Sequence, residues 1–109
     1  GINSNDPDYD SEDSFDNMEK LAEEKGYKYY LVDDTQEIAI SYGATCTPDP
    51  FIFDKEHKLV YHGRINNAME PQDTPTKHDM REVLDKLVVG EKIDEWFVPS
   101  IGCSIKWKN

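Results

Sequence analysis

The feature that most constrains the fold is the segment 44–54, which surrounds the dipeptide Thr47–Pro48. It lies between a helix-ending step at Tyr42–Gly43 and an apolar run, Phe51–Phe53, that favours a buried β-strand. A peptide bond before proline tolerates the cis form, which costs only about 0.5–1 kcal/mol relative to trans. A cis bond here turns the Thr47 carbonyl and amide outward, where an extended substrate strand can pair with them. The alternative is an ordinary trans proline entering a strand, and the local sequence leaves both open.

Length and charge narrow the classes of function. A chain of 109 residues forms one small domain, which buries only about two thirds of its extended-chain surface. Its formal net charge of −11 disfavours nonspecific binding to nucleic acids or anionic membranes, because both need a cationic surface. The sequence has neither a run of about 20 apolar residues nor a secretory signal. We therefore expect a cytoplasmic protein without nucleic-acid or membrane partners.

The acidic residues are concentrated near the start of the chain. Within residues 1–26, only Lys20 and Lys25 oppose them. A solvated helix face explains this cluster more simply than an interaction tail does. Its members are Asp6, Asp8, Asp10, Glu12, Asp13, Asp16, Glu19, Glu23 and Glu24.

The hydrophobic periodicity alternates between that of helices and that of strands. Asp34 is a candidate N-cap, because Glu37 follows it at the spacing of a capping box. Alternating elements followed by a hairpin and a closing helix predict a three-layer α/β domain with a central mixed sheet and flanking helices. The predicted elements are a strand end at Ile2–Asn3, a helix over 11–25, a strand over 27–32, a short helix over 34–43, a hairpin of 51–53 with 59–61, a helix capped by Thr76 and ended by Gly90, and an irregular tail, 91–109, packed on the domain.

Two cysteines provide the candidate redox chemistry. Cys46, two residues before Pro48, is either a resolving or mixed-disulfide thiol or a small apolar core residue. Cys103 follows Gly102, which permits a close backbone approach, and precedes Lys106, which could stabilise a thiolate. The alternative for Cys103 is an unreactive thiol in an anchored tail. The two cysteines are one redox pair, a structural staple or unrelated thiols, and the sequence leaves these possibilities open.

Other site chemistries are poorly supported. His57, His62 and His78 are dispersed without metal-ligand spacing, so we expect no metal, and no cofactor motif is present. For Arg64 a surface ion pair with a nearby acid is the simplest interpretation.

Several motifs extend over nearly the whole chain, and the combination of Cys-Thr-Pro-Asp with Gly-Cys-Ser-Ile-Lys-Trp is the most specific part. The motifs are residues 2–6, 13–15, 31–37, 42–49, 59–61, 63–64 and 99–107. Together they resemble the thioredoxin-like redoxins of the AhpC/TSA type, in particular the peroxiredoxin-like subgroup. Pro50 and Asn66–Asn67 depart from the usual pattern of the group.

The resemblance implies a partial thioredoxin fold in which Pro48 is the cis proline. In such redoxins the reactive cysteine ends an earlier strand, which here would precede Gly1. We therefore expect the chain to continue a longer polypeptide and to lack the central strand between Ile2–Asn3 and Phe51–Phe53. It would then be inactive on its own, and its open sheet edges would invite a homodimer or a strand-swapped oligomer.

Two functions follow as expectations. The first is a thiol–disulfide oxidoreductase or peroxiredoxin-like protein acting on a thiol or disulfide protein or on peroxide. In it, Cys46 and Cys103 are candidate resolving or disulfide thiols, and Thr47 and Pro48 bind the substrate. The second is a non-enzymatic thioredoxin-like module that docks a partner chain at the same loop.

Overall fold

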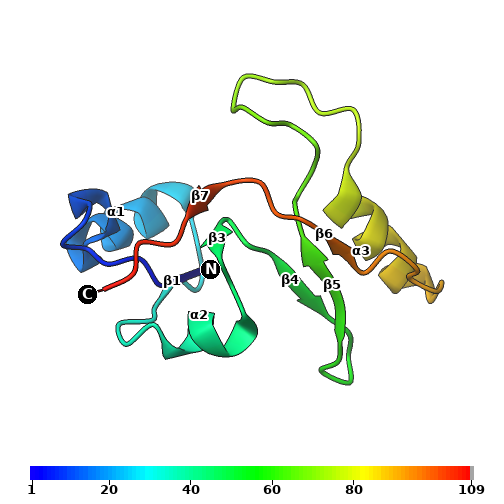
Figure 1. The fold of residues 1–109 in the computed structure, drawn as a ribbon, viewed down its shortest axis with the longest axis horizontal. Helices are drawn as coiled ribbons and strands as arrows, with labels where there is room; N and C mark the ends of the chain where they lie inside the picture. The colour runs from blue at the N-terminus through cyan, green and yellow to red at the C-terminus, as the bar shows by residue number, and fades with distance from the viewer. Residues whose placement is uncertain (109) are drawn as a thin grey trace. The chain divides into compact units, whose positions relative to one another are not determined.

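The computed structural model describes residues 1–108 and shows a small α/β protein. Within the described residues there are three α-helices and several small sheets, both parallel and antiparallel (Figure 1). The chain divides into two compact units. The N-terminal unit contains Gly1–Thr45 and the chain from Ser104 onward, and the central unit contains Cys46–Cys103. No helix of residues 1–108 has the length and apolar character that crossing a bilayer requires.

The N-terminal unit begins with a parallel pair of two-residue strands. β1 pairs with β2 through Ile2 opposite Leu31 and Asn3 opposite Val32. The predicted strand over 27–32 is therefore shorter than expected, because its partner offers only two residues for pairing. The elements of this unit are β1 (Ile2–Asn3), the 3-10 helix η1 (Ser11–Asp13), α1 (Phe15–Lys25), β2 (Leu31–Val32) and α2 (Glu37–Tyr42).

The helix predicted over 11–25 is divided into two parts. A 3-10 turn, η1, comes first, and α1 begins after Ser14, whose hydroxyl accepts a hydrogen bond from the Asn17 amide. α1 ends at Gly26, which adopts a left-handed conformation with φ of 70°. Met18 is the buried residue of the helix.

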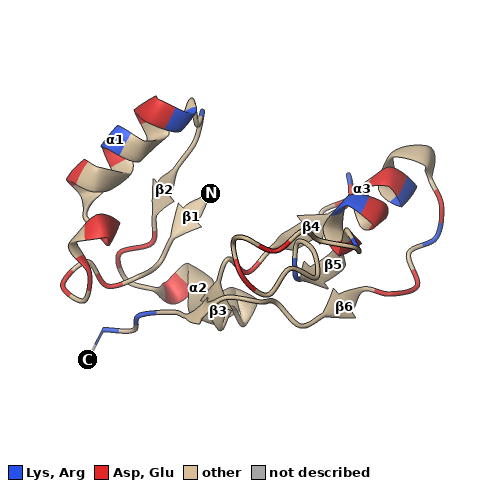
Figure 2. Ribbon diagram, turned by 90° about the horizontal axis from the view of Figure 1, so that it is seen from above, with Lys and Arg blue, Asp and Glu red and all other residues tan. Residues whose placement is uncertain are grey.

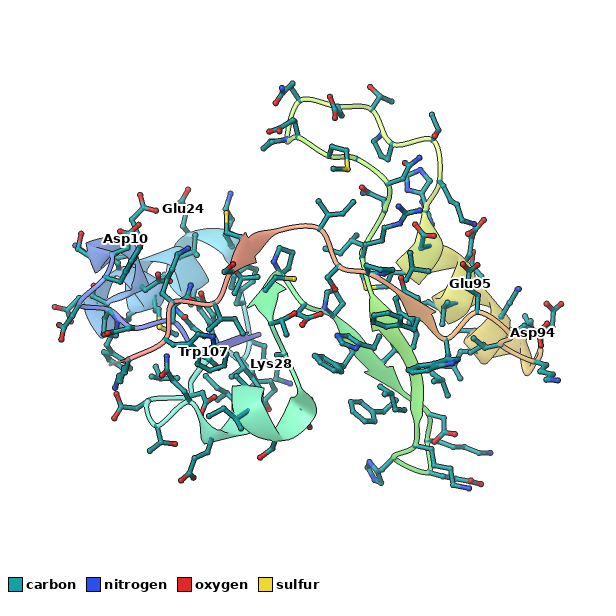
Figure 3. All side chains as sticks on the ribbon, in the orientation of Figure 1. Asp10, Glu24, Lys28, Asp94, Glu95 and Trp107 are labelled. Atoms are coloured by element: carbon teal, nitrogen blue, oxygen red, sulfur yellow. The ribbon has the colours of Figure 1, made fainter. Side chains whose placement is uncertain are left out.

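The acidic residues of α1 and of the loop before it are mostly exposed, as predicted for a solvated face. Figure 2 shows their positions along this segment in red. Asp10 and Glu24 illustrate this arrangement, because both project outward from the ribbon (Figure 3).

The start of α2 is stabilised by Asp33, so the prediction that Asp34 caps this helix is wrong. The Asp33 carboxylate accepts hydrogen bonds from the Ala39 amide at 3.0 Å, the Ile38 amide at 3.3 Å and the Ser4 hydroxyl at 2.7 Å. Burial alone would raise the pKa of Asp33, but these hydrogen bonds lower it below its ordinary value. Asp34 is exposed and pairs with Lys108.

This arrangement predicts that Asp33→Asn destabilises the protein by roughly 1–3 kcal/mol at neutral pH, the cost of a lost cap and a disturbed buried hydrogen bond. A lowered folded-state pKa gives stability that is present above the unfolded pKa of about 3.9 and lost as the pH falls through the folded pKa. The difference in the free energy of unfolding between the variant and the wild type should therefore become smaller toward pH 3. Urea unfolding at pH 7 and pH 3 measures it, with Asp34→Asn as the control. Equal stability of the two variants at pH 7 would contradict the assignment.

The central unit contains a three-stranded sheet in the order β4-β5-β6. β4 and β5 are antiparallel, with Phe51 opposite His62, which confirms the predicted hairpin. β6 adds to β5 in parallel. This strand lies in the C-terminal segment that we expected to be irregular, as does β7. The elements are β3 (Cys46–Thr47), β4 (Phe51–Phe53), β5 (Leu59–Gly63), α3 (Asp79–Val89), β6 (Phe97–Val98) and β7 (Cys103–Ser104), which pairs with β3.

Tyr61 and Val83 are the buried apolar residues between β5 and α3. Tyr61 is only 1% exposed, and its hydroxyl donates to the Arg64 carbonyl oxygen at 2.7 Å. Burial, with the nearby charge of Asp79, raises the pKa of this phenol to about 12. Gly63 allows β6 to approach, because a Cβ at this position would overlap the Val98 carbonyl.

The sequence-based interpretation of Arg64 needs correction. Its Nε donates to Asp79 at 2.7 Å, and the Asp79 side chain is nearly inaccessible to solvent, so this is a partly buried pair rather than a surface pair. The predicted cap at Thr76 is also wrong, because α3 begins three residues later. Thr76 instead forms two hydrogen bonds with the Asn67 side chain.

Candidate functional site

The Thr47–Pro48 peptide bond is cis, which confirms the cis alternative for this bond. The Thr47 carbonyl oxygen, which we expected to turn outward, packs against the Gly102 backbone. Thr47 and Pro48 are both exposed. The loop follows β3, which forms a two-stranded sheet with β7. The backbone of the loop is therefore held on one side by a strand and is open to solvent at its tip.

The two cysteines lie in these paired strands, Cys46 in β3 and Cys103 in β7, and both are thiols. Cys46 is half-buried, and its Sγ donates to the Pro48 carbonyl oxygen at 3.6 Å. Cys103 is exposed. The structure thus places all four candidate site residues, two thiols and the two residues of the cis bond, in one region of the central unit.

Lys106 was a candidate for stabilising a thiolate at Cys103. Its ammonium lies 5.2 Å from the centroid of the Tyr9 ring, in the geometry of a cation–π contact. Its backbone amide donates to the Asn5 side chain. Both the ammonium and the backbone amide of Lys106 therefore contact residues near the start of the chain, and the ammonium is directed to Tyr9.

Gly102 explains how the strand of Cys103 approaches the proline loop. A Cβ at this position would overlap the Thr47 carbonyl oxygen and crowd the Pro48 nitrogen. The close approach that the sequence suggested for Gly102 is therefore real, and it is made to the backbone of the cis dipeptide itself. Only glycine leaves room for this contact.

We expect Gly102→Ala to displace the Thr47–Pro48 loop and to destabilise the protein by about 1–3 kcal/mol, because overpacking against backbone has no cheap relief. Gly1→Ala is the control, since a Cβ there meets the Tyr30 ring at an ordinary 3.5 Å. Urea unfolding gives the stability, and the amide chemical shift of Thr47 reports the displacement. A Gly102→Ala protein with wild-type stability and an unmoved Thr47 resonance would contradict the close contact.

Sequence reasoning missed a cluster centred on Asp49, the residue that follows the cis proline. The Asp49 side chain is only 5% exposed. Its Oδ1 atom accepts a hydrogen bond from the Ser100 hydroxyl at 2.6 Å and lies 2.7 Å from His62 Nε2. The one signal in the sequence was the position of Asp49 directly after Pro48. No local pattern predicts that its side chain contacts His62 and Ser100.

The His62 ring is held within a row of aromatic side chains across the sheet. It stacks on Phe51 with ring centroids 4.0 Å apart and planes 11° apart, and its centroid lies 5.3 Å from that of Phe97. The three residues are register partners on β4, β5 and β6. Because neighbours along a strand point to opposite faces, this row lies on the face opposite Tyr61 and therefore away from α3.

The cluster contains the residue types of a Ser–His–Asp triad but not its geometry. In a triad the imidazole lies between the hydroxyl and the carboxylate and transfers the proton. Here the hydroxyl and the imidazole both bind the same carboxylate oxygen of Asp49. The arrangement therefore holds three segments together and has no relay toward Ser100.

The central unit also contains a hollow of about 190 Å³ beside α3. Glu95, in the segment between α3 and β6, is one of its lining residues (Figure 3). None of the lining residues belongs to the Asp49 cluster or to the proline loop. Among residues 1–108, no group of three or more His, Cys, Asp and Glu side chains is arranged to bind a metal ion.

Two solved structures are similar to this chain over 98% of its length. One is the crystal structure of an uncharacterized conserved protein from Geobacillus kaustophilus, with 49% sequence identity, a TM-score of 0.86 and 58% of that chain covered. The other is a hypothetical protein from Sinorhizobium meliloti, with 39% identity, a TM-score of 0.87 and 60% covered. This chain thus spans less than two thirds of the length of either protein. No protein-family model and no curated protein matches it.

Proposed function

We propose that this chain is part of a thioredoxin-like thiol–disulfide oxidoreductase and that the Thr47–Pro48 loop is its substrate-docking ledge. The observation that carries the proposal is the exposed cis peptide bond flanked by two thiol-bearing strands. Thr47 and Pro48 are exposed residues, and the edge of β3 that faces away from β7 suits main-chain pairing with an extended peptide. A thiol at Cys46 or Cys103 is then near the docked segment.

The finer fold assignment belongs to the same proposal. A cis proline that precedes an antiparallel hairpin, with a helix against that hairpin, agrees with the last part of a thioredoxin fold. The parallel β1–β2 pair with α1 would be the additional αβ unit of the redoxins. A further strand of the fold would be supplied by a segment outside these 109 residues, and the greater length of both similar proteins is consistent with this.

The proposed reaction is two-electron thiol–disulfide exchange. An attacking thiolate, supplied by a segment outside these 109 residues, bonds to one sulfur of a substrate disulfide, and the other sulfur leaves as a thiolate. Cys46 or Cys103 then attacks the mixed disulfide, which releases the second substrate thiolate and leaves a protein disulfide. The substrate gains two electrons and the two protein thiols lose them. We assign the resolving step to these cysteines because no residue over 39–53 is Lys, Arg or His, which would favour a thiolate at Cys46 as the attacking group.

This proposal predicts that a protein extended at its N-terminus to the length of the two similar proteins reduces insulin disulfides or consumes peroxide when dithiothreitol is present to reduce the protein disulfide after each cycle. The 109-residue chain should remain at the background rate, because it lacks the attacking thiol. Turnover measured side by side at equal concentration decides the matter. Equally strong turnover by the short chain would show that the attacking thiol lies within these 109 residues.

A second candidate function is a binding module in which the same loop docks a partner chain without redox chemistry. The exposure of both Thr47 and Pro48 favours it, because backbone pairing at this ledge needs no thiol.

Replacing Cys46 and Cys103 together by serine separates the two functions. Under the redox proposal the extended double variant should lose its multiple turnover and stop at the mixed disulfide, which mass spectrometry detects. Under the module proposal, peptide binding measured by calorimetry should be unchanged. A double variant that keeps full turnover would remove both cysteines from the mechanism.

A further inference from the structure

The Asp49 cluster is a group of part-buried polar side chains that contacts the proline loop directly. Asp49 follows Pro48 in the chain, and its carboxylate is almost completely withdrawn from solvent. A buried carboxylate is tolerated only when its oxygen atoms are hydrogen-bonded. The partners that satisfy Asp49 therefore also fix the position of the loop that carries it.

These partners come from segments far apart in the sequence. His62 lies in the middle of the sheet, where its ring stacks on Phe51 and has Phe97 as a tilted neighbour. Ser100 lies two residues before Gly102, whose backbone touches the Thr47 carbonyl. One carboxylate oxygen thus connects the loop after the cis bond, the strand β5 and the segment that leads into β7.

Two contacts consequently fix the ledge from opposite ends. Gly102 packs against the carbonyl before the proline, and Asp49 anchors the residue after it. Ser100 and Gly102 belong to the same short segment. Loss of the hydrogen bond from Ser100 to Asp49 therefore loosens both the end of the loop at Asp49 and the segment that packs against Thr47. The effect should fall on the placement of a docked peptide and not on the intrinsic reactivity of the thiols.

We propose that Asp49, held by Ser100 and His62, is the positioning residue that sets the geometry of the Thr47–Pro48 ledge for peptide disulfides. This inference rests on the redox function proposed above and specifies its substrate class. The favoured substrates are disulfides carried on an extended peptide, which the ledge can align. Small disulfides without a peptide backbone gain nothing from it.

Two probes with the same leaving group test this inference on the N-terminally extended protein. One is a short peptide whose single cysteine is joined to thionitrobenzoate, and the other is the symmetrical disulfide of thionitrobenzoate. In both cases a protein thiolate bonds to one sulfur, and thionitrobenzoate leaves as a coloured thiolate that is followed by absorbance. The ratio of the two second-order rate constants isolates the contribution of the peptide backbone.

We expect Ser100→Ala to lower the rate constant for the peptide probe by about tenfold, the scale of one lost hydrogen bond to a charged group. The rate constant for the symmetrical probe should change by less than about twofold. Ser100→Thr keeps the hydroxyl and should restore the peptide preference. Ser41→Ala, the same substitution at an exposed serine of α2, should leave both rate constants unchanged.

The outcomes separate this inference from the function on which it rests. If the wild-type protein prefers the peptide probe and Ser100→Ala keeps the full preference, the positioning role is overturned and the docking function stands. If Ser100→Ala lowers both rate constants equally, the cluster has only a general structural role and the inference also fails. A wild-type protein without any peptide preference would overturn the docking function and the inference together.

Discussion

Buried carboxylates that accept several hydrogen bonds organise both units of this protein. The strands are only two to five residues long, so their ladders contribute few backbone hydrogen bonds. Asp33 accepts hydrogen bonds from the start of α2 and from the loop after β1. Asp49 connects the proline loop with β5 and with the segment before β7. Asp79 binds Arg64, which follows β5. Because a buried carboxylate without partners is costly, each of these residues restricts the segments that carry its hydrogen-bond donors.

The parts of the fold that could be predicted from the sequence are those that depend on a few neighbouring residues. Helix ends at Gly26, Gly43 and Gly90 depend on local backbone conformation, and all three adopt the left-handed geometry that the positions of these glycines indicated. The hairpin is likewise encoded within a few residues, whereas the local sequence around Pro48 left the cis and trans forms open.

The buried polar contacts depend on partners that local patterns do not reveal. Asp33 and Asp34 are adjacent and chemically identical, and only the side chain that turns inward toward Ser4 caps the helix. Ser100 is 51 residues from Asp49, so no periodicity joins them. β6 was missed for a related reason, since a two-residue strand beside β5 has no detectable alternation.

The candidate site shows the same division between local and distant signals. The cis dipeptide and both cysteines were identified from sequence, and the structure brings their strands together. The strands can approach because residue 102 is glycine. Any side chain at this position would overlap the Thr47 carbonyl and separate β7 from the loop. The second strand of the candidate site therefore depends on Gly102, a residue more than fifty positions away from Pro48 in the chain.

This geometry also bears on how a thiol in the site would become useful. Cysteines gain reactivity either from nearby positive charge or from precise placement of the disulfide they attack. No cationic residue flanks Cys46 in sequence, and the ammonium of Lys106, the lysine nearest to Cys103 in sequence, is directed to the Tyr9 ring. Under the proposed function, placement of the peptide disulfide on the ledge is therefore the source of rate that the structure makes visible, and the hydrogen bonds of Asp49 contribute to it by holding the ledge.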